Sequence, residues 1–167
     1  MKRQLINLVS VVLVSMLCGY SSFGQEQSFR ELPPITISAA ASGKAASAKV
    51  NKMFAGYFKN ASNLRWFELG KKFLVKFTMN GQENRALFTG SGDLVYHVAY
   101  GTESHLPAGV RNLVKSTYFD QKITKVLKVS QDLKTIWVVY MEDDKDLIWV
   151  RVEDGELEET QRIEKSK

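Results

Sequence analysis

The side chains best suited to acid–base or nucleophilic chemistry are His97 and His105, the only histidines, and Ser104 beside the second. A serine nucleophile needs a base that faces it, and neighbours in sequence rarely face each other. The chain has no Gly-x-Ser-x-Gly motif, no acidic partner for His105 is indicated, and two histidines supply too few zinc ligands. We therefore predict no enzyme, no catalytic residue and no cofactor. His97, on the strand face of Val95 and Ala99, is interpreted as a surface or interface residue.

A run of four carboxylates, Glu142, Asp143, Asp144 and Asp146, is the best candidate for a hard cation such as calcium. The run lacks the glycine and the closing glutamate of an EF-hand loop. Because Lys145 lies among the acids and moderates their repulsion, we interpret the run as a solvated hairpin tip and predict no metal site.

Aromatic side chains are the remaining feature. A sheet that carries a helix on one side cannot bury all of them beneath it, so we expect about two-thirds in the core and the rest on an open sheet face. The three tryptophans, interleaved with Lys76 and Arg151, have the composition of a protein-binding surface, although they could equally pack two repeats together. The aromatics in predicted strands are Trp66, Phe67, Phe73, Phe77, Phe88, Tyr96, Tyr100, Trp137, Tyr140 and Trp149.

Residues 1–24 are predicted to be a secretory signal peptide, because a basic start precedes an apolar stretch and small residues lead to Gly24. That stretch is shorter than the about 20 residues of a membrane span, so we expect no stable membrane insertion after cleavage. Cys18 allows a lipoprotein alternative, which Leu17 before it disfavours. The predicted location is periplasmic or secreted.

Cys18 is the only cysteine, so the mature chain has no disulfide and no thiolate metal site. Losing Lys2 and Arg3 with the leader lowers the formal net charge from +5 to +3. The remaining basic residues are scattered singly and in pairs. This pattern indicates a solubility charge, and we predict no nucleic-acid partner.

Apolar periodicity predicts two similar arrangements of a helix followed by strands. Val50, Phe54 and Phe58 form one stripe of a helix, and Asn80-Gly81 supplies the positive φ angles of a two-residue hairpin turn. Four strands are predicted after the first helix at 64–69, 73–79, 85–89 and 94–100. Four more follow a second helix at 123–129, 135–141, 147–152 and 157–163.

The two arrangements align at an offset of 60 residues in the helix and 63 in the strands. The matched strand positions are Phe73, Val75 and Phe77 with Ile136, Val138 and Tyr140. We therefore predict an α+β fold, a tandem duplication of a helix plus four-stranded antiparallel sheet unit, in which the two sheets join side by side or face each other. The expected domains are a flexible tether at 25–47, a first unit at 48–101 and a second at 102–167.

The strand at 135–141 is apolar on both faces. If Ile136, Val138 and Tyr140 form the core, the other face needs a cover, either the other repeat or a partner. We predict that the open sheet faces bind a partner protein, through Trp66, Trp137, Val139, Met141 and Trp149.

The order of several loose motifs resembles the PepSY-like group of exported bacterial proteins, also described as β-lactamase-inhibitor-like. The matching segments are Asn60-Ala61, Leu64-Arg65-Trp66, Phe73 to Phe77, Asn80-Gly81, Arg85 to Phe88, Gly92-Asp93-Leu94 and Leu106-Pro107. The resemblance covers Val50 to about Ile163. It implies a helix lying on a four-stranded antiparallel sheet and a role in binding or inhibition, and it carries over no catalytic residue.

The predicted function is that of an exported, non-enzymatic binding protein that engages or inhibits another extracytoplasmic protein through its sheet face. The alternative is a carrier that holds a small apolar or peptide ligand in a groove between the two units.

Overall fold

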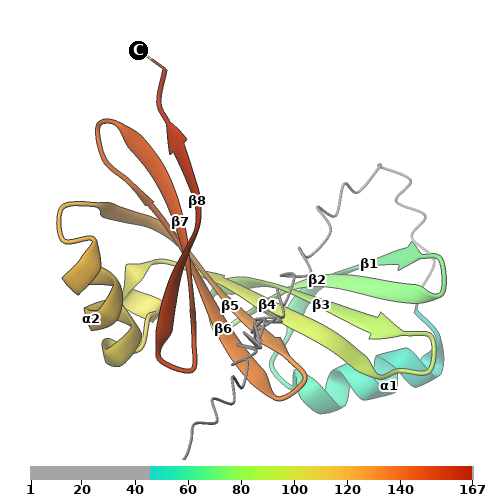
Figure 1. Ribbon diagram of the computed structural model, residues 1–167. Helices are drawn as coiled ribbons and strands as arrows, with labels where there is room; N and C mark the ends of the chain where they lie inside the picture. The colour runs from blue at the N-terminus through green and yellow to red at the C-terminus, as the bar shows by residue number, and fades with distance from the viewer. Residues whose placement is uncertain (1–45, 167) are drawn as a thin grey trace, which may run out of the picture. The chain divides into compact units, whose positions relative to one another are not determined.

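The structure is a computed structural model that describes residues 46–166, all within one compact unit. The predicted leader, Cys18 and residues 25–45 of the predicted tether lie outside the described residues. The elements, in chain order, are α1 (Ala48–Tyr57), β1 (Ser62–Leu69), β2 (Lys72–Met79), β3 (Gln82–Thr89), β4 (Leu94–Gly101), η1 (Glu103–His105), α2 (Ala108–Thr117), β5 (Lys122–Gln131), β6 (Lys134–Glu142), β7 (Asp146–Glu153) and β8 (Glu156–Glu164) (Figure 1).

The strands form one eight-stranded antiparallel sheet in chain order, from β1 to β8. The prediction of an α+β tandem duplication of a helix plus four-stranded sheet unit is therefore wrong, and the fold is largely β with two short helices. The continuous sheet has a physical reason. Pairing β4 with β5, for example Val98 with Val129, satisfies backbone groups that two separate sheets would leave at open edges. The domain boundaries at 48–101 and 102–167 stay a prediction.

The first helix closes an aromatic core over the first four strands. Ser47 caps α1 by accepting the Val50 N–H at 3.3 Å, and Val50 and Phe54 are its buried residues. The Phe54 ring meets Phe77 edge-on at 5.1 Å between centroids, and Phe88 is fully buried beside it. This half of the core is stabilised by ring packing.

The second helix closes a core that is mostly aliphatic. Val114 of α2 is fully buried, as are Val139, Ile148 and Val150 on the strands beneath it. The Tyr118 hydroxyl at the end of α2 donates to Glu159 at 2.7 Å and ties the helix to β8. Burial and this hydrogen bond raise the pKa of Tyr118 to about 12.

Both cores lie on the same face of the sheet, which we call the helix-covered face. Ala86, in the core under α1, pairs with His97 on β4. His97 and Gly101 share one face because strand side chains alternate. Gly101 pairs with Val126, which belongs to the core under α2. The opposite side is called the second face.

The register on β6 corrects the predicted faces of that strand. Val139 and Met141 are 0% and 1% exposed and lie in the core under α2. Val138 and Tyr140 lie on the second face, so the 63-residue alignment paired Val75 of the helix-covered face with a residue of the opposite face. A one-residue slip moves every side chain of a strand to the other face. The alternation of apolar and polar residues could not reveal this error in the alignment, because β6 is apolar on both faces.

Candidate partner-binding face

His97 occupies the edge of the aromatic core. Its ring lies 4.8 Å from Phe58, and its Nε2 is 2.9 Å from Oδ1 of buried Asn84. Burial, and to a lesser extent the charge of Lys128, lowers the pKa of His97 to about 4. The ring is therefore neutral near pH 7 and donates its Nε2 proton to Asn84. The residue has a packing role, not the surface role predicted from its strand position.

Ser104 and His105 lie in the turn before α2. The Ser104 Oγ is 3.4 Å from the His105 Nδ1, and that nitrogen also accepts the Thr102 backbone N–H at 3.1 Å. Since a backbone donor holds Nδ1, this atom is a poor general base for the serine. The local geometry is that of a capped turn.

The acidic hairpin tip is organised by its own hydrogen bonds. The Asp143 Oδ1 accepts the backbone N–H groups of Lys145 and Asp146, each at 2.7 Å. These bonds hold the pKa of Asp143 below its ordinary value. The Asp146 carboxylate accepts from Arg162 at 2.7 Å, and Lys165 approaches Glu142 at 3.3 Å. Among residues 46–166, no cluster of three possible metal ligands is found.

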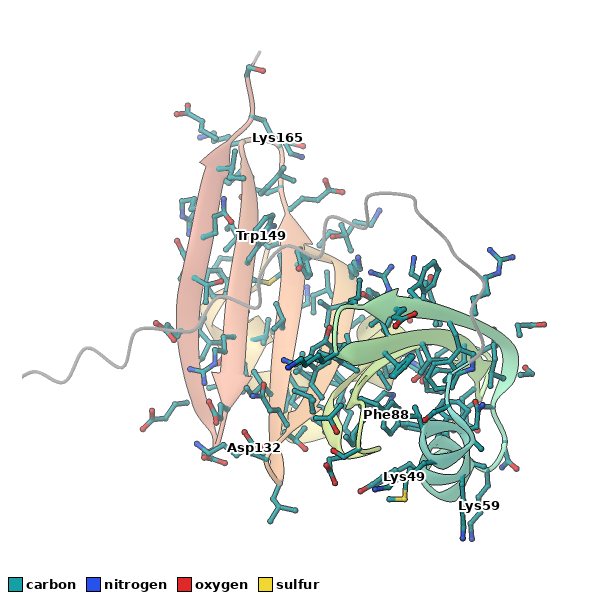
Figure 2. All side chains as sticks on the ribbon, turned by 90° about the vertical axis from the view of Figure 1, so that its right-hand side faces the viewer. Lys49, Lys59, Phe88, Asp132, Trp149 and Lys165 are labelled. Atoms are coloured by element: carbon teal, nitrogen blue, oxygen red, sulfur yellow. The ribbon has the colours of Figure 1, made fainter. Side chains whose placement is uncertain are left out.

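The five predicted partner-binding residues are divided between the two faces. Val139 and Met141 are core residues, and Trp66 and Trp137 are partly buried against the cores under α1 and α2. These four lie on the helix-covered face and do not form an open surface. Trp149 pairs with Tyr140 on the second face, and Figure 2 shows it over the C-terminal strands, whereas Phe88 lies next to α1.

A row of alternating cationic and aromatic side chains crosses the second face from β3 to β7. The Arg85 Cζ lies 4.8 Å from the centre of the Tyr100 ring. The Lys125 Nζ lies 5.0 Å from the Tyr100 ring and 5.6 Å from the Tyr140 ring. The Tyr140 and Trp149 centroids are 5.2 Å apart. We call these five residues the aromatic–cation row.

The row is partly exposed, and its charges are placed over ring faces. Each cation lies within about 6 Å of a ring centroid, the range of attraction to aromatic faces. Partial burial raises the pKa of Tyr100 and of Tyr140, so both hydroxyls stay protonated near pH 7. The second face also holds buried, mostly apolar side chains, whereas the row combines aromatic and charged side chains that are partly exposed. The buried set is Leu74, Leu87, Tyr96, Val98 and Val129.

Sequence reasoning missed Arg85, Lys125 and the grouping of the two tyrosines. Tyr100 and Lys125 come together only because β4 pairs with β5 across the turn, η1 and α2. One sequence feature did indicate on which face Arg85 lies. The Asn80-Gly81 turn fixes the β2–β3 register and thereby places Arg85 and Lys76 opposite each other on the second face.

No protein-family model matches the chain, and no curated protein matches it. The fold is similar to that of a BLIP-like protein from Bacteroides fragilis, at 15% identity and a TM-score of 0.60, over 72% of this chain and 86% of that one. A DUF2874 family protein from Bacteroides ovatus is similar at 19% identity and a TM-score of 0.61, over 73% and 89% of the two chains.

A third similar structure, from Bacteroides eggerthii, is provisionally described as periplasmic and shares 18% identity at a TM-score of 0.59, over 72% and 89% of the two chains. No helix among the described residues is long and apolar enough to cross a membrane. At these identities the likeness shows the fold alone. A BLIP-like fold is thus supported, and the PepSY-like resemblance is not specifically shown.

Proposed function

We propose that this chain is an exported, non-enzymatic binding protein that engages another extracytoplasmic protein through the second face of its sheet, with the aromatic–cation row at the centre of the contact. The single observation that carries the proposal is the row itself. Tyr, Trp and Arg are the residue types that most often dominate binding energy at protein interfaces.

The arrangement of the molecule supports this assignment. The helix-covered face is largely covered by α1 and α2, and most of its apolar side chains pack in the two cores. The row keeps large ring surfaces partly exposed on a rigid sheet, which limits the conformational entropy that binding would cost.

Export is supported by the predicted leader and agrees with the neighbour described as periplasmic. Terminal sequencing of the secreted product should find Gln25 first, whereas lipidated Cys18 would contradict a soluble product.

Affinity capture from the envelope fraction tests the proposal when wild type is compared with Trp149→Ala and Tyr140→Ala. We expect one stoichiometric partner for wild type and at least tenfold weaker binding for each variant, as for truncated interface anchors. Phe119→Ala is the matched control, because Phe119 is 75% exposed and lies outside the row. An equal loss of partner binding in Phe119→Ala, or no loss of binding in Trp149→Ala and Tyr140→Ala, would contradict the proposal.

A second candidate function, the binding of a small apolar ligand, is favoured by a groove of about 530 Å³ beneath the start of α2. Its apolar lining comes from Val110, Leu113, Trp137 and Val152. The groove lies wholly within residues 107–155. Co-purified lipid or peptide, lost on Leu113→Trp, would favour this second function.

A further inference from the structure

A cavity of about 400 Å³ opens at one end of the aromatic–cation row. It is bounded by the start of β3, the end of β4, the turn before α2 and β5. The side chains that matter for its chemistry are Gln82, Glu83, Arg85, Tyr100, Thr102, His105 and Lys125.

Two cations line the cavity, and neither is fully neutralised by the protein. Lys125 makes no ion pair with another residue of the range 46–166, and its Nζ is held only over the rings of Tyr100 and Tyr140. The Arg85 Nη2 contacts the Glu83 Oε1 at 3.2 Å, while its buried Nε has no acceptor among the described residues. Glu83 is 57% exposed, so its pairing with Arg85 is weakened by solvent.

Further N–H donors, from His105 and Gln82, complete the wall of the cavity. Because the His105 Nδ1 accepts the Thr102 N–H at 3.1 Å, the ring carries its proton on Nε2, which is the donor atom. The Gln82 Nε2 donates to the Tyr100 carbonyl at 3.0 Å and retains a second N–H. Gly101 allows these groups to approach, since a Cβ there would lie 2.9 Å from the Gln82 Nε2 and 3.0 Å from the His105 Cβ.

We propose that this cavity binds a carboxylate, and that the carboxylate belongs to an acidic side chain of the protein partner. The inference rests on the proposed function, because the row that would contact the partner ends in the cavity. A guanidinium, an ammonium and N–H donors are the groups that bind carboxylates most strongly in proteins. Glu83 opposes the bound charge, so its removal should strengthen binding.

The test is an amide NMR titration of the mature chain with N-acetyl-glutamate α-amide, whose only carboxylate is on the side chain, and with N-acetyl-glutamine α-amide as the neutral analogue of the same shape. We expect chemical-shift changes at Gly101, Thr102 and His105 with the glutamate ligand and none with the neutral glutamine ligand. Lys125→Gln should weaken binding about tenfold, the value of a charge-assisted hydrogen bond. Glu83→Gln should strengthen it. The matched control is Lys128→Gln on the same strand, which lies over the Trp137 ring on the helix-covered face and should leave binding unchanged.

Equal shifts with both ligands, or equal losses in Lys125→Gln and Lys128→Gln, would overturn the carboxylate site. A competition experiment separates this inference from the proposed function. If N-acetyl-glutamate α-amide binds the cavity and displaces the captured partner, the assignment to a partner side chain is supported. If it binds without displacing the partner, that assignment is wrong. If binding of the partner is lost on Trp149→Ala but is unaffected by Lys125→Gln, the contact through Trp149 is supported and the carboxylate site in the cavity is wrong.

Discussion

The two faces of this sheet are built from similar residue types but used differently. On the helix-covered face, rings such as Phe54 and Phe77 meet one another at 5.1 Å and are sealed by α1. On the second face, Tyr100 and Tyr140 meet the cation of Lys125 instead and stay partly exposed. Neither helix lies on the second face, because the register places both cores on the other side. Ring content alone therefore does not distinguish a core from the surface that we propose for binding, whereas the neighbours of each ring differ between the two.

The largest expected effect comes from placing one charge on either side of β6. Val139→Asp would bury a carboxylate in the core under α2 and should cost several kcal/mol, about 4 or more, which would unfold much of the protein. Val138→Asp, at the adjacent position on the second face, should cost far less. Chemical denaturation of the pair measures the difference. Equal losses, or a larger loss for Val138→Asp, would show that the faces are assigned the wrong way round.

A large-to-small change sharpens the same contrast for the aromatic core. Phe88 is 0% exposed and contacts Phe54 and Trp66, so Phe88→Ala should lower the free energy of unfolding by about 3–5 kcal/mol. Phe119→Ala removes the same side chain from a position that is 75% exposed. The free energy of unfolding of Phe119→Ala should stay within about 0.5 kcal/mol of the wild-type value. Urea unfolding measures both variants, and the two free energies can be compared directly if the slopes of the curves are unchanged. Comparable losses of stability in Phe88→Ala and Phe119→Ala would contradict the described core.

The lowered pKa of His97, on the helix-covered face, predicts that the stability of the protein depends on pH. The pKa of His97 falls from 6.5 to about 4 in the folded chain. Between these values the unfolded chain binds more protons, so the free energy of unfolding should fall as the pH drops from 6.5 towards 4, by an amount on the order of 2 kcal/mol. His97→Gln keeps a donor for Asn84 but cannot titrate. Between pH 6.5 and 5 the free energy of unfolding of this variant should fall less than that of wild type. Parallel plots of unfolding free energy against pH would contradict the assigned burial of His97.

The smallest expected effect concerns the turns that set the register of each half. Asn80 and Gly81 adopt φ values of 53° and 74°, which suit these residues. The β5–β6 turn uses Asp132 and Leu133 at 49° and 66°, and Leu133 is fully exposed. A left-handed conformation is unfavourable for a leucine, so Leu133→Gly should stabilise the protein by about 0.5–1 kcal/mol. Gly81→Ala should destabilise it by a similar amount, and thermal unfolding measures both. A loss of stability on Leu133→Gly would contradict the described turn.

Sequence patterns located the elements better than they located their faces. The stripe of Val50, Phe54 and Phe58 and the Asn80-Gly81 turn are confirmed, because each depends on interactions within a few residues. The sequence left open whether the two four-stranded sheets join side by side or face each other, since nothing local specifies that β4 pairs with β5. The faces of β6 were wrong because both its faces are apolar and its turn, at Asp132-Leu133, lacks the glycine that marks the first hairpin.

The structure places the five predicted partner-binding residues on both faces of the sheet, and their binding role stays a prediction. Trp149 lies on the second face as part of the row, while Trp66, Trp137, Val139 and Met141 belong to the helix-covered face. Lone cations such as Arg85 and Lys125 look like ordinary surface charges in a sequence. Only the register across β3, β4, β5 and β6 brings them over the tyrosine rings.

Site-directed photo-crosslinking in the exporting cell tests the central claim, that the second face contacts a partner, most directly. A benzophenone amino acid in place of Trp149 keeps a large aromatic group in the row, and the same probe in place of Phe119 reports on an exposed aromatic position outside it. We expect one discrete protein adduct at position 149 and none at position 119. An adduct only at position 119, or no adduct at position 149 while the folded chain is abundant, would contradict partner binding through this face.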